Sequence, residues 1–411
     1  MTNKLSDSPV DRVATRSSSV EVLHVFFRLG CTSFGGPIAH LGYYRKEFVE
    51  RRKWCGESTL AEIIAIAQSL PGPASSQTGF AIGILRAGWL GGLAAWVGFT
   101  VPSAILMLAF AFGHSFIRGE VGDGLLHGLR LVAVAVVAQA VLAMQRSLAP
   151  DRMRIAFAVV ATALSLFLPL QVATLAPIVL GALAGLVLLR SDDEANFDAV
   201  ELPVSKRAGV IAGTLFLLLL ATLPILARVL ATPALDIFST FYQTGALVFG
   251  GGHVVLPLLE SAVVGRGWVA QQSFLTGYGA AQALPGPLFC FGAYLGASIR
   301  PSTNPLAYGL ISLIGIFAPG LLAMAAVLPF WSAVRGNRSF RRALKGVNAS
   351  VVGILIAALF HPLWTSTILH ASDFWIALAA FALLTAWKVQ PWKVVAGVAA
   401  VSILVSVTLG H

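Results

Sequence analysis

The chain has 411 residues, of which 57% are hydrophobic and only 11% are charged, and its mean hydropathy is +0.82. Soluble domains carry about a quarter charged residues, so this composition excludes an ordinary soluble protein and indicates folding within a lipid bilayer. The net charge of +10 does not indicate nucleic-acid binding, because the basic residues lie in short connections between apolar segments.

Residues 1–20 are polar and lack the apolar core of a cleavable signal peptide, so we expect a disordered cytoplasmic tail. Beyond it, long segments without Asp, Glu, Lys or Arg are each at least about as long as the roughly 20 residues needed to cross a membrane as a helix. These segments are 87–117, 155–189, 208–227, 237–259, 267–299, 301–334 and 346–372. The sequence predicts an all-α polytopic membrane protein.

The first motifs are FGGP at 34–37 and QSLPGP at 68–73. The apolar segment 58–70 would be about 20 Å long as a helix, which is too short to cross alone. Pro71 and Pro73 lack amide protons, and their rings clash with the preceding turn, so no continuous helix passes through them. The element is either a re-entrant hairpin of two half-helices or one broken spanning helix. Nine and thirteen crossings are both compatible with it.

Both motifs recur in the second half of the chain. FGGG at 249–252 matches FGGP at an offset of 215 residues, and QALPGP at 282–287 matches QSLPGP at an offset of 214. TVPSAILML at 100–108 also resembles FAPGLLAMA at 317–325. The sequence therefore predicts two homologous repeats.

The predicted repeats span residues 21–190 and 236–409, with a polar cytoplasmic linker at 191–207 and a linking transmembrane helix at 208–230 between them. One extra crossing between two copies inverts the second relative to the first. Basic connections are expected in the cytoplasm, which predicts a cytoplasmic N-terminus and an external C-terminus.

A helix broken at membrane depth leaves backbone amides without partners, and a bound anion can satisfy them. Glycine pairs beside the breaks allow the backbone to approach a ligand closely. Polar side chains next to the breaks add donors, although caps and kinks of ordinary membrane helices would use the same residues. The candidate anion ligands at these breaks are Gly35, Gly36, Gln68, Pro71, Gly72, Pro73, Ser75, Ser76, Gln77, Gly250, Gly251, Gly252, His253, Gln282, Pro285, Gly286 and Pro287. Asn348, in KGVNAS, is a weaker candidate.

Four charged residues are assigned further roles. Arg28 lies in an otherwise apolar run before FGGP, where it is either an anion ligand or a side chain that reaches the interface. Glu62 precedes QSLPGP and is a candidate proton carrier, unless it belongs to the first turn of its helix. Arg86 and Arg300 occupy matching positions and are candidate guards of the two entrances, or simple anchors.

The motifs also carry a family resemblance. FFRLGCTSFGGPIAHL at 26–41, AQSLPGP at 67–73, GFTVPSAIL at 98–106, and the second-half FGGGHVVLPLL and AQALPGP resemble the chromate ion transporter family in its two-domain form. The resemblance implies efflux of chromate from the bacterial cytoplasm across the inner membrane, which confers resistance, with sulfate as the isosteric competitor. It implies a monomer or homodimer that needs no cofactor or metal.

Other functions stay open. A carrier of sulfate or another oxyanion would have the same architecture. A membrane-embedded enzyme that acts on lipid phosphates is the alternative from another class, but no HExxH, DxxD or GxSxG pattern lies inside an apolar segment. We therefore expect a transporter that exposes its site alternately to the two sides of the membrane.

Overall fold

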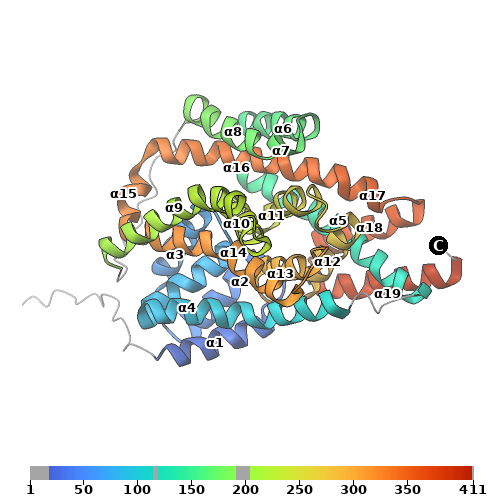
Figure 1. Ribbon diagram of the computed structural model, residues 1–411, viewed down its shortest axis with the longest axis horizontal. Coiled ribbons are helices and arrows are strands. Elements are labelled where there is room, and N and C mark those ends of the chain that lie inside the picture. The colour runs from blue at the N-terminus through green and yellow to red at the C-terminus, as the bar shows by residue number, and fades with distance from the viewer. Residues whose placement is uncertain (1–17, 114–118, 191–203, 410–411) are drawn as a thin grey trace, which may run out of the picture.

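A computed structural model describes residues 18–113, 119–190 and 204–409. Every regular element in these ranges is helical, which confirms the predicted fold class (Figure 1). The predicted N-terminal tail and most of the predicted linker lie outside the described residues.

The first repeat contains eight α-helices and one π-helical segment. They are α1 (Ser19–Thr32), α2 (Gly36–Tyr44), η1 (Arg45–Arg51), α3 (Glu57–Ser69), α4 (Ala74–Gly113), α5 (Gly119–Leu148), α6 (Arg152–Phe167), α7 (Leu170–Ala173) and α8 (Leu175–Leu188). The next described helix is α9 (Lys206–Leu230), which follows the first repeat and covers the segment predicted as the linking helix.

The second repeat follows α9 with the same order of broken and long helices. Its elements are α10 (Pro233–Ala246), η3 (Gly252–Val254), α11 (Val255–Leu259), η4 (Glu260–Val264), α12 (Gln271–Ala283), η5 (Leu288–Cys290), α13 (Phe291–Ser298), α14 (Pro305–Val327), η6 (Leu328–Phe330), α15 (Trp331–Gly336), α16 (Arg338–Ala358), η7 (Leu359–Trp364), α17 (Thr365–Thr367), α18 (Ala371–Thr385) and α19 (Pro391–Leu409).

Short polar side chains mark where several helices begin. Ser18 accepts a hydrogen bond from Val20 N at 3.1 Å, Asp151 from Arg154 N at 2.9 Å, and Asn304 from Ala307 N at 3.0 Å. Each cap satisfies an amide that no intrahelical carbonyl can reach. The helix α4 is broken at Ala87 and Gly88, which have non-helical backbone angles.

Six of the described helices are long and apolar enough to cross a membrane, and four further apolar helices have 10–17 residues. The protein is therefore a multi-pass membrane protein. Within the hydrophobic window of α9 only 17% is buried in the protein, so most of this helix presents its surface to lipid. The number of crossings stays a prediction, because the shorter helices allow both counts.

Matching pairs of helices pack closely in the two repeats. The helix α1 lies on α4 at Gly30, where an added Cβ would come within 2.8 Å of Phe99 O. The equivalent Gly245 of α10 lies on α14, and an added Cβ there would overlap Ile316 O. Glycine at both crossings lets two backbones approach each other without a side chain between them.

The repeats also exchange their last helices. The helices α6 and α8 of the first repeat pack on α16 of the second, and α18 and α19 pack on α5 of the first. Figure 1 shows α6 and α8 lying along α16. The α8–α16 crossing has glycine on both sides, since an added Cβ at Gly346 would overlap Gly181 O. The exchange joins the two repeats into one body.

Replacing Gly346 with Leu should separate α8 from α16, because the new side chain has no space against the Gly181 backbone. We expect less folded protein in detergent and a lower melting temperature. The control is Gly397→Leu on α19, where an added Cβ has no neighbour within 4 Å. Equal melting temperatures for the two variants would show that this crossing is not tight.

Candidate functional site

The two Pro-Gly-Pro loops contact the opposite repeats through matching backbone hydrogen bonds. Gly72 N of the first loop donates to Val248 O of the second repeat at 2.8 Å. Gly286 N of the second loop donates to Ser33 O of the first repeat, also at 2.8 Å. Val248 and Ser33 each precede the Phe-Gly-Gly motif of their own repeat, so the two bonds are equivalent in the repeats.

Each loop also lies against the proline-containing helix of the other repeat. Gln77 Nε2 donates to Pro71 O at 2.9 Å and to Gly320 O of α14 at 2.8 Å. In the mirrored contact, Ser103 Oγ of α4 donates to Pro285 O. Gly320 and Ser103 occupy equivalent positions, one residue after Pro319 and Pro102. The loops and glycine motifs from both halves therefore meet between the repeats.

Only glycine fits at the centre of each loop. Gly72 has φ +116°, and an added Cβ would lie 2.7 Å from Gly320 Cα. Gly286 has φ +87°, and an added Cβ there would overlap Ser103 Oγ. Both residues thus combine a left-handed backbone with a close approach to another chain segment.

The expectation that every amide at these breaks is open to an anion is wrong for Gly72 and Gly286, because carbonyls of the other repeat accept from them. The situation differs at the start of α4. Its hydrogen bonding begins with Gln77 N to Pro73 O at 3.0 Å. The preceding amides of Ala74, Ser75 and Ser76 are helix-terminal amides, which intrahelical carbonyls leave unsatisfied. They give this buried end a partial positive charge.

Several buried polar atoms of the first repeat have no hydrogen-bond partner among the described residues, some at this helix end and others beside the loop of the second repeat. They are Ser33 Oγ, His40 Nδ1, Tyr44 OH, Ser76 Oγ, Gln77 Oε1 and Thr100 Oγ1. The six residues are each at most 2% exposed.

Ring contacts and the helix backbone show where these residues lie. The rings of His40 and Tyr44 lie 5.2 Å and 5.6 Å from that of Phe99, the neighbour of Thr100. Tyr44 OH lies 3.1 Å from the position of a Cβ at Gly79, one turn beyond Ser76. His40 Nε2 lies 3.2 Å from Ser33 O, the acceptor of Gly286 N. An unpartnered polar atom at such depth is costly unless a ligand or water satisfies it.

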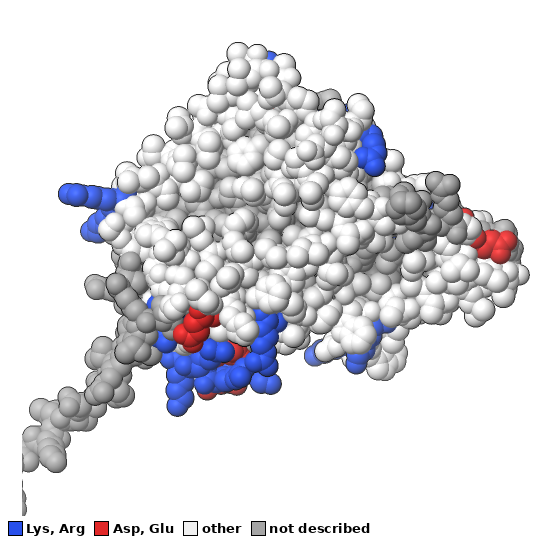
Figure 2. Space-filling view, turned by 60° about the horizontal axis from the view of Figure 1, so that its bottom comes forward, with Lys and Arg blue, Asp and Glu red and all other residues white. Residues whose placement is uncertain are grey.

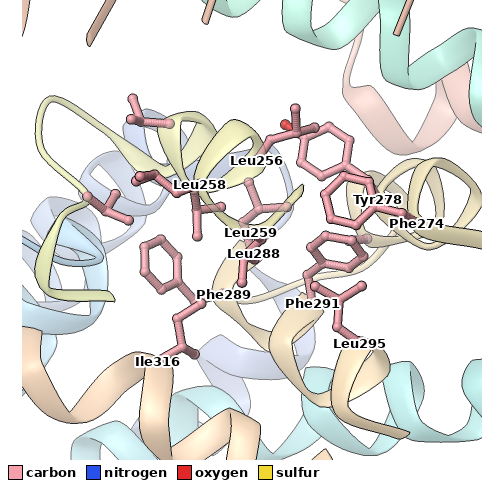
Figure 3. Close-up of a cluster of buried hydrophobic side chains, with 14 of the residues drawn as sticks. Leu256, Leu258, Leu259, Phe274, Tyr278, Leu288, Phe289, Phe291, Leu295 and Ile316 are labelled. Atoms are coloured by element: carbon pink, nitrogen blue, oxygen red, sulfur yellow. The ribbon is translucent and has the colours of Figure 1, made fainter. Parts of the chain in front are cut away.

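The equivalent helix end in the second repeat is apolar. Phe289, Cys290 and Phe291 stand where the first repeat has Ser75, Ser76 and Gln77. Figure 3 shows Phe289 and Phe291 within a cluster of Leu, Ile and aromatic side chains. This end begins with the short η5 turn, in which Cys290 N donates to Pro287 O at 3.0 Å. The pattern of the repeats alone predicted an anion site at each of the two half-helices. The two helix ends differ in their side chains, so they do not offer equal sites.

The remaining candidates of the second repeat lie around its glycine motif. His253 Nδ1 lies 2.9 Å from Tyr278 OH. The side chain of Gln282 interacts with the hydroxyl group of the same Tyr278. Gly250 approaches the side chain of Asn348, whose Oδ1 would be 3.4 Å from an added Cβ.

Most of the other motif glycines have a positive φ, the backbone conformation that glycine adopts most readily. Gly35, Gly36, Gly250 and Gly251 have positive φ, whereas Gly252 begins the helical turn η3.

Four sequence-predicted residues lie outside the buried polar group. Arg28 and Gln68 are exposed on α1 and α3. Arg86 lies over the ring of Trp54, with its guanidinium carbon 5.3 Å from the ring centroid. Glu62 is only 5% exposed on α3, and it is not without an interaction partner.

Trp54 belongs to a charged cluster that the sequence reading did not single out. Arg52 donates to Glu47 at 2.6 Å and to Glu21 at 3.3 Å, and its guanidinium lies over Trp54 at 5.5 Å. Burial raises the pKa of Glu47, but hydrogen bonds from Arg52 and Arg51 outweigh it and hold that pKa below its usual value. Figure 2 shows that charged side chains gather in a few patches on a mostly uncharged face.

The same type of contact, an arginine paired with an acid and lying over a tryptophan ring, recurs in the second repeat. Arg266 pairs with Asp236 at 3.0 Å and lies over Trp268 at 5.0 Å, in the places of Arg52, Glu21 and Trp54. Extending the 214–215 residue offset to charged residues would have identified these pairs from the sequence.

The family model of the chromate transporters matches this chain twice, over residues 20–186 and 235–403. The chain belongs to the chromate transporter family. The two matched ranges are offset by 215 residues at their starts, as the motifs are, which shows that the two repeats are homologous.

Three full-length relatives of this chromate transporter family member are named as chromate transport proteins or a probable one. The chain is 28% identical to the chromate transport protein of Pseudomonas aeruginosa, covering 94% of this chain and 92% of that protein. It is 25% identical to the probable chromate transport protein of Synechococcus elongatus, over 90% of each. It is 24% identical to the chromate transport protein of Cupriavidus metallidurans, over 95% and 94%. No solved structure matches the chain.

Replacing Gly72 with Ala should destabilise the contact between the repeats, because the methyl group meets the Gly320 backbone and the left-handed φ is strained. The control is Gly119→Ala, which has φ +81° but no atom within 4 Å of the added Cβ. We expect a melting temperature in detergent clearly below that of the control. If both variants melt together, the loop contact is looser than described.

Proposed function

We propose that this protein is a secondary transporter that exports chromate across the bacterial cytoplasmic membrane. Membership of the family and the names of three full-length relatives support chromate as the substrate. Those homologues are named transport proteins, which supports a transporter rather than an enzyme. A dianion that leaves a negatively charged cytoplasm gains about 2.3 kcal/mol per charge per 100 mV, so the membrane potential suffices to drive export.

The proposed binding site is the N-terminal end of α4. The observation that carries it is the pair of buried, unpartnered hydroxyl groups of Ser76, at a helix end with unsatisfied amides, and of Tyr44, one turn further along α4. Hydroxyl and amide donors at a helix N-terminus are suited to a tetrahedral oxyanion. Ser75, Gln77 and the Pro71–Gly72–Pro73 loop shape this site, and Gln282 and His253 belong to the opposing wall in this scheme.

The proposed mechanism is alternating access between two inverted repeats. The interlocked loops form the point about which the repeats move, since each loop is held by a single backbone bond and one side-chain contact. If the N-terminus lies in the cytoplasm, as the basic connections predict, the charged cluster around Trp54 faces the cytoplasm. The equivalent region around Trp268 faces outward.

Arg28, Arg86 and Arg300 stand outside the proposed binding site. Arg86 serves as an anchor through Trp54. Arg28 is exposed on α1, where its stem covers apolar surface and its head reaches water. Arg300 is considered in the following subsection.

Removing one donor at the α4 end should weaken chromate binding without unfolding the protein. We expect Ser76→Ala and Tyr44→Phe each to raise the KM for chromate about tenfold in proteoliposomes, because each loses a hydrogen bond to a charged ligand. Ser147→Ala and Tyr43→Phe are the controls, since Ser147 Oγ donates within its own helix and Tyr43 is the neighbour of Tyr44.

Unchanged KM values in both site variants would reject this site. Wild-type vesicles that move sulfate but not chromate would instead identify a carrier of another oxyanion, and competition between the two ions in the same assay distinguishes these results.

Glu62 is the proposed carrier of a counter-proton, because it is a buried carboxylic acid on the helix that leads to the first loop. We expect Glu62→Gln to remove the pH dependence of chromate transport while chromate binding is retained. The measurement is the initial transport rate as a function of pH, from about 5 to about 8. A pH profile identical to that of the wild type would exclude this role.

A further inference from the structure

A basic cavity lies at the junction of α9, α10 and the two loops that carry Trp268 and Arg300. Its volume is about 540 Å³, and its wall includes Arg228, Arg266, Arg300 and Asp236. A second cavity of about 510 Å³ shares Trp268 and Arg300 with it. We call the larger cavity the α9 vestibule.

The charges of the α9 vestibule match a dianion. Arg266 is paired with Asp236 at 3.0 Å, which leaves Arg228 and Arg300 as uncompensated charges of the wall. Arg300 Nη1 donates to the carbonyl of Ile299 at 3.2 Å, a contact that neutralises no charge. No acidic side chain in the described ranges forms an ion pair with Arg228 or Arg300. The guanidinium group is suited to planar, two-point recognition of oxyanions.

Neutral donors complete the wall. Thr232, Ser239, Gln243 and Tyr308 bring hydroxyl and amide groups to the same cavity. Gln243 occupies the position that Arg28 has in the first repeat. A wall with two guanidinium groups that have no acidic partner among the described residues, and with several neutral donors, is more suited to a small oxyanion than to an apolar ligand.

The equivalent region of the first repeat has a different arrangement of charges. There Arg52 binds two acids, Glu21 and Glu47, whereas Arg266 binds Asp236 and has Ala262 in the place of Glu47. Arg86, the equivalent of Arg300, lies over Trp54 instead of in a cavity wall. Among the residues that the structure describes, nothing precedes α1 in the way that α9 precedes α10, and the C-terminal end of α9 supplies Arg228. In the second repeat the arginine beside the tryptophan therefore has one acidic partner instead of two, and α9 adds Arg228 to the same wall.

We infer that the α9 vestibule is an oxyanion-binding site, distinct from the α4 end, that holds a tetrahedral dianion on the outer side of the transporter. This inference rests on the proposed function, because the vestibule would be the last binding site that an exported oxyanion occupies before its release. The two uncompensated arginines attract the dianion from the centre, and the wide, solvated cavity releases it.

The test compares initial rates of chromate transport in proteoliposomes, with sulfate as competitor. The double variant Arg228→Gln/Arg300→Gln should raise both the KM for chromate and the Ki for sulfate about tenfold, and weaken their dependence on ionic strength. Arg228→Lys/Arg300→Lys should recover most of the affinity, because it restores both charges. Arg152→Gln, which removes an exposed arginine on α6, should leave both constants unchanged.

The melting temperature of each variant in detergent shows whether it is folded. If the folded Gln variant keeps the wild-type constants and salt dependence, the vestibule does not bind the substrate, although the proposed transport stands. If the wild type moves neither chromate nor sulfate, the proposed function and this inference both fail.

Discussion

The structure depends on one constraint, which is that a peptide group buried at membrane depth must have a hydrogen-bond partner. The two prolines of each Pro-Gly-Pro loop have no amide hydrogen, so the glycine amide is the backbone donor of the loop. Each amide finds its acceptor just before the glycine motif of the other repeat. Neither repeat can satisfy its own break, so the repeats must assemble around the two breaks together.

Symmetry of the backbone does not carry over to the side chains. Backbone bonds at Gly72 and Gly286 are equivalent, and so are the glycine crossings at Gly30 and Gly245. Around this shared frame the first repeat has serine and tyrosine where the second has phenylalanine and leucine. A frame that both repeats need for folding is constrained in both. The side chains around the frame are not constrained in this way. One copy could therefore form a polar site while the equivalent side chains of the other copy pack as hydrophobic core.

The sequence predicted the helical class, the repeats, the break in each repeat and the helix between them, because composition and recurring Gly-Pro motifs determine these features locally. It could not predict that α6 and α8 pack on α16 of the other repeat, because helices with similar apolar faces allow several pairings. Nor could it predict that Ser33 O and Val248 O occupy the loop amides, since these carbonyls come from distant segments.

The candidate site was predicted in part for the same reason. Ser75, Ser76 and Gln77 are adjacent to the break in sequence, and the motif identifies them directly. Tyr44 reaches the same place through the fold of α2 against α4, and no local pattern signals it. Arg28 was singled out because a charge in an apolar run is conspicuous, but the face of α1 that carries it is exposed.

Hydrogen exchange at the two loops tests the central claim most directly. Proline has no amide hydrogen, so Gly72 supplies the single exchangeable amide of residues 71–73, and Gly286 that of residues 285–287. Mass spectrometry of overlapping peptides whose ends differ by these residues isolates the exchange of each glycine amide by subtraction. If the repeats interlock as described, both amides exchange orders of magnitude more slowly than in an unstructured peptide. Exchange of either amide at the unstructured rate, in protein that remains folded, would contradict the account.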